Sequence, residues 1–204
     1  MVTKQDSRPD ATKARRPAAE RRALIEEAAA RLFARNGYES TTVEDIVKAA
    51  GVSKPMLYRH FESKRELHIR LMERRRDALA AEPLGSFLEA AGSLQQRLAV
   101  MIDAWFAHVE RHPDSSRLLF VDVTGDSEIR ELQLELRRRQ RAADVAMLRE
   151  FGPPLPEAEL EPLGEIIRSS LTGLALWRLD RDDVPRAVVV AAMLRTIRGL
   201  LWVG

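Results

Sequence analysis

The chain has 204 residues, 45% of them hydrophobic, which is enough for one large helical domain or a small domain followed by a medium one. It has no apolar run of roughly eighteen residues and no apolar stretch near its first residue. We therefore expect a cytoplasmic protein without a membrane span or signal peptide. The absence of cysteine excludes disulfides, thiolate metal sites and cysteine nucleophiles.

The net charge of +2 conceals an uneven distribution of charge. The segment from Met1 to Arg76 contains 18 Lys and Arg against 11 Asp and Glu, a net charge of +7. The rest contains 15 against 20, a net charge of −5. A basic front and an acidic rear indicate that only the front contacts a polyanion, although an ordinary solvated surface is the alternative.

The first predicted elements are a disordered basic tail over residues 1–17 and a helix that begins at Ala18. Apolar side chains from Ile25 to Phe33 recur at the three-to-four spacing of one buried helix face. Asn36-Gly37 ends this helix, because glycine adopts the backbone conformation that follows a helix terminus.

A short second helix is expected next, because two overlapping pairs can form a capping box. Thr41 precedes Glu44, and Thr42 precedes Asp45, each by three residues. Either hydroxyl is placed to accept an unpaired backbone N–H at the start of the helix. Gly51 ends the helix after about two and a half turns.

A third short helix follows the turn Gly51-Val52-Ser53. Ser53 is a suitable N-cap, and Pro55 falls in the first helical turn, where its missing N–H costs little. Leu57 and Phe61 point inward, and Val52 is placed to pack on Leu57 as a hydrophobic staple. Ser63-Lys-Arg-Glu66 is a further capping box, which begins a fourth helix that extends to about Ala81.

We expect the fourth helix to end before Glu82-Pro-Leu-Gly85. After this segment the chain is rich in Leu and Ala, and longer helices are expected. Capping boxes at Ser86 and Ser93 start new helices. The segment from Arg117 to Val123 is apolar and is compatible with a strand or a helix, and its helical neighbours favour a helix. Periodic apolar stripes predict further helices over 94–109, 129–147, 160–174 and 185–197. The predicted fold class is all-α, with a small basic bundle followed by a larger acidic one.

The small bundle has the helix-turn-helix plan, in which two short helices are joined by a three-residue turn. Its residues Thr42, Gly51-Val-Ser-Lys, Leu57-Tyr-x-His-Phe61 and Ser63-Lys-x-x-Leu67 closely resemble the DNA-binding domain of the TetR family of bacterial transcriptional repressors. The resemblance runs from about Arg21 to Leu71.

That resemblance implies a sequence-specific DNA-binding regulator and not an enzyme. Such a protein is most often a repressor that a small effector releases from a palindromic operator, and it needs no cofactor or metal. The implied domains are the tail over 1–17, a helix-turn-helix DNA-binding domain over 18–64, and an effector-binding and dimerisation domain over 65–204. The fourth helix would link the two domains and tilt when effector binds.

The resemblance also implies roles for individual residues at the DNA. Thr42, Ser53, Tyr58, His60 and Lys64 would contact phosphates, which set the register of the protein on the duplex. Lys54, Pro55 and Arg59 would face bases, and Arg59 is suited to guanine O6 and N7.

Several alternatives remain open for these residues. Many family members have glycine where this chain has Pro55. Tyr58 is alternatively a core aromatic residue, His60 a packing residue, and Arg59 a phosphate contact. Arg15 and Arg16 of the tail either enter the adjacent minor groove or belong to a disordered segment.

In the larger bundle, the family dimerises through its last two helices, here about 157–180 and 184–202. The alternative is that their apolar stripes face only the chain's own core. The stripes that would form the dimer interface are Leu163, Ile167, Leu171 and Leu174 on the first helix and Val188, Ala192 and Ile197 on the second.

An effector cavity for a largely apolar molecule is also implied, although its lining is equally what an ordinary core contains. Arg117, Asp122 and Arg168 are candidate polar anchors. The bulky residues that would line the cavity are Phe87, Met101, Trp105, Phe106, Phe120, Met147 and Trp177.

Two rival functions start from other observations. His108 and His112 lie one helical turn apart and are candidate zinc ligands, but the order His-Val-Glu-Arg-His differs from H-E-x-x-H and no third ligand is evident. An architectural DNA-binding protein without an effector would keep the helix-turn-helix but bind DNA with little sequence preference.

Overall fold

The computed structural model describes residues 17–120, 126–181 and 183–202, and everything below concerns these residues. They form nine helices and no strand, which confirms the predicted all-α fold class. The helices are α1 (Ala18–Asn36), α2 (Val43–Ala50), α3 (Lys54–Tyr58), α4 (Lys64–Glu89), α5 (Leu94–Arg111), α6 (Pro113–Phe120), α7 (Ser127–Phe151), α8 (Glu157–Leu179) and α9 (Arg186–Leu201).

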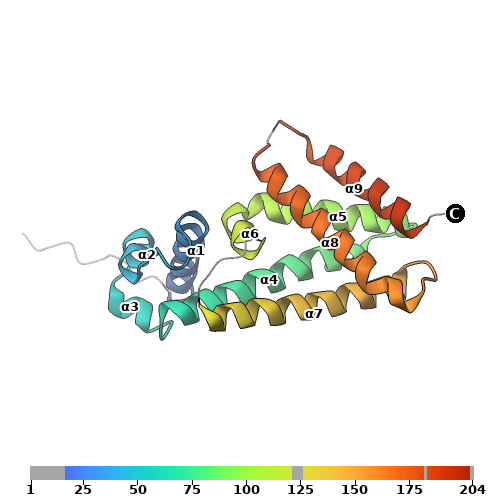
Figure 1. The fold of residues 1–204 in the computed structure, drawn as a ribbon. Coiled ribbons are helices and arrows are strands. Elements are labelled where there is room, and N and C mark those ends of the chain that lie inside the picture. Colours follow the sequence, from blue (N-terminus) through green and yellow to red (C-terminus); the bar gives the residue numbers. More distant parts are fainter. Residues whose placement is uncertain (1–16, 121–125, 182, 203–204) are drawn as a thin grey trace, which may run out of the picture.

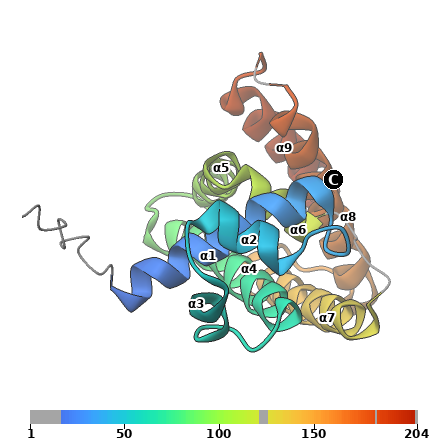
Figure 2. The same ribbon diagram turned by 90° about the vertical axis from the view of Figure 1, so that its left-hand side faces the viewer.

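The molecule is elongated, with α1, α2 and α3 gathered at one end (Figure 1). Helices α4 and α7 run side by side along its length, and α5, α8 and α9 lie over their far part. Figure 2 views the molecule along its long axis from the end that contains α1, α2 and α3, and it shows α2 and α3 facing outward at this end. Helix α4 has 26 residues and reaches from α3 into the larger bundle. None of the helices in the described ranges is long and apolar enough to cross a bilayer.

The start of α2 has the predicted capping box, and it uses the second of the two candidate pairs. Thr42 Oγ1 accepts the Asp45 N–H at 3.1 Å, and Asp45 Oδ2 accepts the Thr42 N–H at 3.0 Å. Thr41 is instead fully buried and donates its hydroxyl to the Gly37 carbonyl at 2.8 Å. Gly51 ends α2 with a φ of 64°, the left-handed conformation that favours glycine.

The small bundle shares its core with the large one. Phe33, Leu57 and Phe61 are at most 1% exposed, and they belong to one apolar cluster with Leu118 of α6 and Ile129 of α7. The predicted boundary between the two domains lies at residue 64. Helices on both sides of this boundary contribute to the same core, so the two predicted domains pack on one another. A displacement of α6 or α7 has a direct route to the helix-turn-helix through this shared core.

The predicted break near Glu82-Pro-Leu-Gly85 is wrong, because α4 continues through it to Glu89. Pro83 removes one backbone N–H, but it is buried, and Phe87 one turn later is fully buried. Glu82 accepts hydrogen bonds from His108 and Arg111 of α5. These tertiary contacts override the local helix-breaking preference of proline. The sequence pattern shows only that local preference and not the contacts.

The apolar segment that was compatible with either a strand or a helix is helical in its described part. It lies in α6, Pro113–Phe120, as its helical neighbours favoured. Residues 121–125 at the end of that segment, including the predicted polar anchor Asp122, lie outside the described residues.

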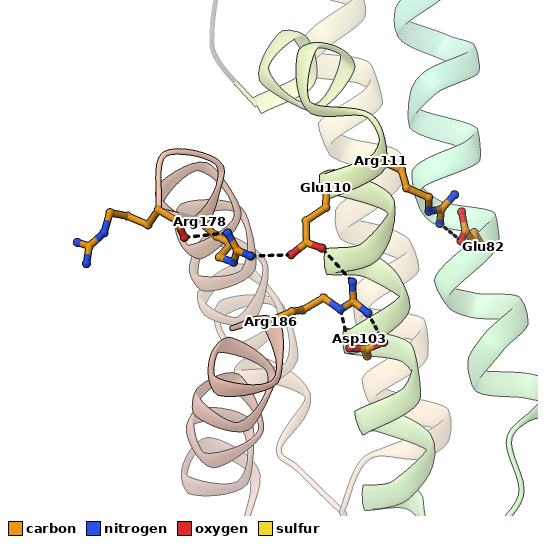
Figure 3. A network of polar contacts seen from close by, with 7 residues as sticks. Glu82, Asp103, Glu110, Arg111, Arg178 and Arg186 are labelled. Carbon is orange, nitrogen blue, oxygen red and sulfur yellow. Dashed lines mark hydrogen bonds and ion pairs between the residues drawn. The ribbon is translucent and has the colours of Figure 1, made fainter. Parts of the chain in front are cut away.

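A network of ion pairs joins α5 to the last two helices (Figure 3). Arg186 at the start of α9 donates from Nε to Asp103 at 2.8 Å and from Nη1 to Glu110 at 2.9 Å. Arg178 of α8 approaches Glu110 from the other side at 3.5 Å. Beneath this network, Phe106, Val189 and Met193 pack in the second apolar core. Helices α5, α8 and α9 are thus fixed to one another independently of α1 to α3.

Candidate nucleic-acid interface and ligand cavity

Helix α3 is attached by one side and exposed on the other. Leu57 is fully buried and Phe61 is 1% exposed, so both anchor the segment to the small core. Tyr58, one residue after Leu57, is 45% exposed and is therefore not a core aromatic residue. The other predicted DNA-facing residues that are exposed are Thr42, Ser53, Lys54, Pro55 and Arg59.

Lys54 and Glu44 connect the two helices of the helix-turn-helix. The Lys54 ammonium pairs with the Glu44 carboxylate of α2 in an exposed ion pair. This hydrogen bond, with the attraction between the two charges, lowers the pKa of Glu44 and raises that of Lys54. A DNA contact through Lys54 therefore competes with an existing partner, whereas Arg59 is exposed without such a pair in the described residues.

Lys64, expected to contact phosphate, is half-buried and makes two hydrogen bonds and one ring contact within the chain. Its Nζ donates to the Tyr38 carbonyl at 2.9 Å and to the Thr41 carbonyl at 3.0 Å, and it lies 4.1 Å from the centroid of the Tyr38 ring. Two of the three ammonium hydrogens are thus occupied. Lys64 ties the start of α4 to the loop between α1 and α2.

The remaining predicted phosphate contacts differ in how free their polar atoms are. The Thr42 hydroxyl donates to Asp45 Oδ2 at 2.6 Å as well as accepting the Asp45 N–H, so it is committed to the cap. Ser53 makes no side-chain cap bond. His60 is half-buried, with its ring centroid 6.4 Å from that of Phe61. Arg15 and Arg16 lie outside the described residues.

A cavity of about 700 Å³ lies among the side chains of α4 to α9 and has a mainly apolar lining. Four of the seven predicted residues line it, namely Met101, Trp105, Phe120 and Met147. The other three lie elsewhere: Phe87 and Phe106 are at most 1% exposed in the core, and Trp177 is 43% exposed. Trp105 stands between the two groups, because it lines the cavity and its ring meets that of Phe106 edge-on at 5.1 Å.

One part of the cavity wall is polar and strongly charged. Arg168 pairs with Asp144, which also accepts from Gln140 Nε2 at 3.1 Å. Burial raises the pKa of Asp144 despite its pairing with Arg168. Arg137 and Arg141 also line this part. Of the predicted polar anchors, Arg168 is therefore at the cavity, whereas Arg117 pairs with the exposed Asp180 at 2.7 Å.

Arg76 of α4 lines the same region and was missed by the sequence analysis. Its Nε is inaccessible to solvent and has no hydrogen-bond partner in the described residues. Burial, together with the neighbouring Arg137 and Arg168, lowers its pKa. No sequence signal distinguishes it, because it follows Arg74 and Arg75 in a run that reads as a solvated charged face.

The predicted dimer stripes mostly face inward. Leu163, Ile167, Leu171 and Leu174 pack against the chain's own second core, and Ile197 is 5% exposed. Ala192 is half-buried, and only Val188 is well exposed, at 53%. The sequence pattern thus identified the core-facing side of α8 and α9 together with one outward residue.

A different set of apolar side chains covers the outward side of these two helices. Ile166 and Trp177 of α8 are 46% and 43% exposed, and Val188 near the start of α9 is 53% exposed. Gly173 lies between the first two along α8, and a Cβ added there would meet nothing within 4 Å. We call Ile166, Gly173, Trp177 and Val188 the outer α8–α9 face.

The two candidate zinc ligands serve other contacts. His108 is 6% exposed and its Nδ1 lies 2.7 Å from Glu82 Oε2, while its ring centroid is 4.8 Å from that of His112. Within the described ranges, no group of three or more His, Cys, Asp or Glu side chains is arranged to hold a metal ion.

Comparison with known proteins agrees with the helix-turn-helix assignment. Residues 25–71 match the family model described as bacterial regulatory proteins, tetR family. The transcriptional activator FasR of Mycolicibacterium smegmatis is 36% identical over 106 residues, which are 52% of this chain and 48% of the relative. The transcriptional repressor KstR2 of Mycobacterium tuberculosis is 35% identical over 92 residues, 45% of this chain and 46% of the relative. The matched region thus spans about half the length of these curated relatives.

The fold is also shared over most of the chain. The regulator FadR from Bacillus subtilis, solved in complex with stearoyl-CoA, superposes with a TM-score of 0.69 over 88% of this chain and 97% of its own, at 18% identity. That identity establishes the likeness of fold alone. The family model and the named relatives thus show that the first part of the chain is similar to bacterial regulatory proteins of the tetR family, and the solved structure shows that the fold is shared over most of the chain.

Proposed function

We propose that the chain is a sequence-specific DNA-binding transcriptional regulator in the cytoplasm, with α3 as the helix that enters the major groove. The observation that carries this proposal is the position of α3 at the end of the molecule, anchored by Leu57 and exposed at Tyr58 and Arg59. A helix fits the roughly 12 Å wide groove, where each base pair presents a distinct donor and acceptor pattern.

The division of labour along this surface follows from which groups are free. Arg59 is proposed as the main base contact, with Pro55 packing on a thymine methyl and Lys54 joining after it leaves Glu44. Ser53, Tyr58 and His60 are proposed phosphate contacts. The Thr42 hydroxyl is occupied by Asp45, so a phosphate at this position would bind the backbone amides at the start of α2. Lys64 has one ammonium hydrogen left, and it would contact phosphate together with the amides at the start of α4.

The proposed assembly is a homodimer through the outer α8–α9 face. Its apolar side chains Ile166, Trp177 and Val188 are exposed in the single chain, and the open surface at Gly173 permits close helix approach. A dimer would present two α3 helices to half-sites about 34–36 Å apart on a palindromic operator. One helix alone contacts too few bases to discriminate well.

The cavity supports regulation by a small, largely apolar effector. Its volume of about 700 Å³ lies within the range of about 300–1,000 Å³ that is usual for ligand pockets. The FadR structure in complex with stearoyl-CoA indicates that a protein of this fold binds a large acyl compound. FasR is named an activator and KstR2 a repressor. We propose repression, with the effector releasing the operator by binding the DNA-incompetent conformation more tightly.

The test is binding to DNA at several salt concentrations. Footprinting upstream of the chain's own gene supplies a palindromic duplex, which is compared with a random duplex of equal length. We expect the palindrome to bind at least about a thousandfold more tightly. Arg59→Ala should cost about 1–3 kcal/mol at one base-pair position, whereas Arg138→Ala on α7 serves as a matched surface control.

Equal affinity for both duplexes would instead indicate an architectural DNA-binding protein. For the assembly, Trp177→Asp with Val188→Asp should yield a monomer by sedimentation and abolish preference for the palindrome. A double variant that stays dimeric would exclude the outer α8–α9 face as the interface.

A further inference from the structure

Three consecutive arginines on α4 point in three different directions, because successive residues of a helix lie about 100° apart. Arg74 Nη1 pairs with Glu26 of α1 at 2.5 Å, and Arg75 Nη2 pairs with Glu27 of α1 at 2.9 Å. Glu26 is 4% exposed. Arg76, the next residue, turns away from α1 and lines the cavity.

No ion pair holds Arg76 in the part of the chain that the structure describes, and its Nε has no hydrogen-bond partner there, although the adjacent Asp77 attracts its charge. An arginine stays protonated in a protein, so it cannot escape the cost of burial by losing its charge. Of the carboxylates on the cavity wall, Asp144 is committed to Arg168 and Gln140, and Glu165 lies 3.8 Å from Arg141 and 3.7 Å from Arg168. Arg137 and Arg168 add further positive charge around Arg76. A partly buried charge without a partner is costly, and this cost is relieved by a bound anion.

Most of the cavity wall is apolar and offers no favourable contact to a small, fully hydrated anion. Leu79, Met101, Trp105 and Phe120 are among the many apolar side chains of the lining. Burying such surface favours a ligand with a long apolar part. A molecule that satisfies both regions has an anionic head and an apolar tail.

We propose that the cavity binds an amphipathic anion with its charged head on Arg76. The candidates are a medium- or long-chain carboxylate and an acyl thioester that carries phosphate groups. Arg168 and Arg137 border the head, and the apolar tail lies against Trp105 and Phe120. This proposal deepens the proposed effector function and rests on it for its consequence at the operator, but the binding itself stands independently of DNA.

The position of Arg76 also indicates how occupancy reaches the DNA-binding end. A rotation or shift of α4 that brings Arg76 onto the head group moves Arg74 and Arg75, and with them their pairs to Glu26 and Glu27 of α1. The same helix begins at Lys64, which is tied to the Tyr38 and Thr41 carbonyls beside the helix-turn-helix. The effector would therefore act on α1 to α3 through one rigid helix.

The test uses the full chain and three probes of equal chain length: dodecanoate, dodecanol and dodecanoyl-CoA. Calorimetry without DNA measures each affinity. We expect at least one anionic probe to bind about tenfold or more tightly than uncharged dodecanol, because hydrogen bonds to charged groups are the stronger ones. Dodecanoate alone would indicate a carboxylate head, and dodecanoyl-CoA alone a phosphate-bearing one.

Arg76→Met should weaken the preferred anion about tenfold or more and leave dodecanol unchanged, while Arg76→Lys should retain part of the affinity. Arg138→Met on α7 is the control, because Arg138 is 69% exposed and does not line the cavity, and it should leave all three affinities unchanged. Equal binding of dodecanol and both anions to the unmodified chain would overturn the proposal, as would binding of none of them. These outcomes need no variant to fold, and they are independent of whether the chain binds a palindrome.

Discussion

The two ends of the molecule obtain their functional surfaces in different ways. The helix-turn-helix is built from neighbours in sequence: the Thr42–Asp45 cap, the Gly51 turn and the Leu57 anchor all lie within sixteen consecutive residues, 42–57. The cavity is assembled from six helices, α4 to α9. A surface made locally can be inferred from spacing, whereas one made by long-range packing cannot.

The packing of the two ends offers the largest contrast that can be tested. Leu57→Ala should destabilise the chain by about 2–5 kcal/mol, because Leu57 is fully buried in a filled core. Met147→Ala should cost about 1 kcal/mol or less, since Met147 already borders open space and loses fewer contacts. Urea unfolding of both variants measures the difference.

Similar losses for the two substitutions would mean that the cavity is filled by rearranged side chains in solution. Leu57→Met is a volume-conserving control, which should cost less than about 1.5 kcal/mol. It separates the effect of the void from that of changing the residue.

The same contrast explains what the sequence alone could predict. The caps at Thr42 and Ser93, the turn at Gly51 and the helical periods follow local rules, and the structure confirms them. The passage of α4 through Pro83 depends on contacts with α5, more than ten residues away in sequence, so local rules gave a false break.

Side-chain orientation in the larger bundle was harder still to predict. The stripe Leu163, Ile167, Leu171 and Leu174 identified one helix face correctly but not which partner covers it. Periodicity reports that a face is apolar and does not distinguish a chain's own core from a second copy. Arg76 was invisible for a related reason, since its burial depends on α7 and α8.

A second contrast concerns acid, and it is intermediate in size. His68 of α4 is 1% exposed, packs edge-on against Phe33 at 4.8 Å between ring centroids, and leaves Nδ1 without a partner in the described residues. Burial, with a smaller contribution from Lys64 and opposed by Asp126, lowers the pKa of His68 to about 4.

The lowered pKa of His68 makes the small core sensitive to pH. Between about pH 6.5 and pH 4 the unfolded chain binds a proton at His68 and the folded chain does not, so stability falls as pH falls. The full loss is about 3 kcal/mol at 1.36 kcal/mol per pKa unit. In urea unfolding across this range, the unmodified chain should lose about 3 kcal/mol more stability toward acid than His68→Leu, which has no group to protonate at this position. Parallel curves would show that the pKa of His68 is the same in the folded and the unfolded chain.

The smallest expected effect compares two neighbouring arginines of α4 in the absence of ligand. Arg75→Met removes the partner of Glu27 and should lower stability by about 0.2–1 kcal/mol, the usual value for a partly exposed ion pair. Arg76→Met removes an unpaired, partly buried charge and should leave the ligand-free chain equally stable or raise its melting temperature.

Adding the preferred anion should then stabilise the unmodified chain and Arg75→Met, but stabilise Arg76→Met much less. Opposite signs of the stability change for these two substitutions would support different roles for adjacent side chains of α4. Arg75 would stabilise the contact with α1, and Arg76 would be available to bind a ligand. A loss of stability in both variants would mean that Arg76 has a partner within the folded chain.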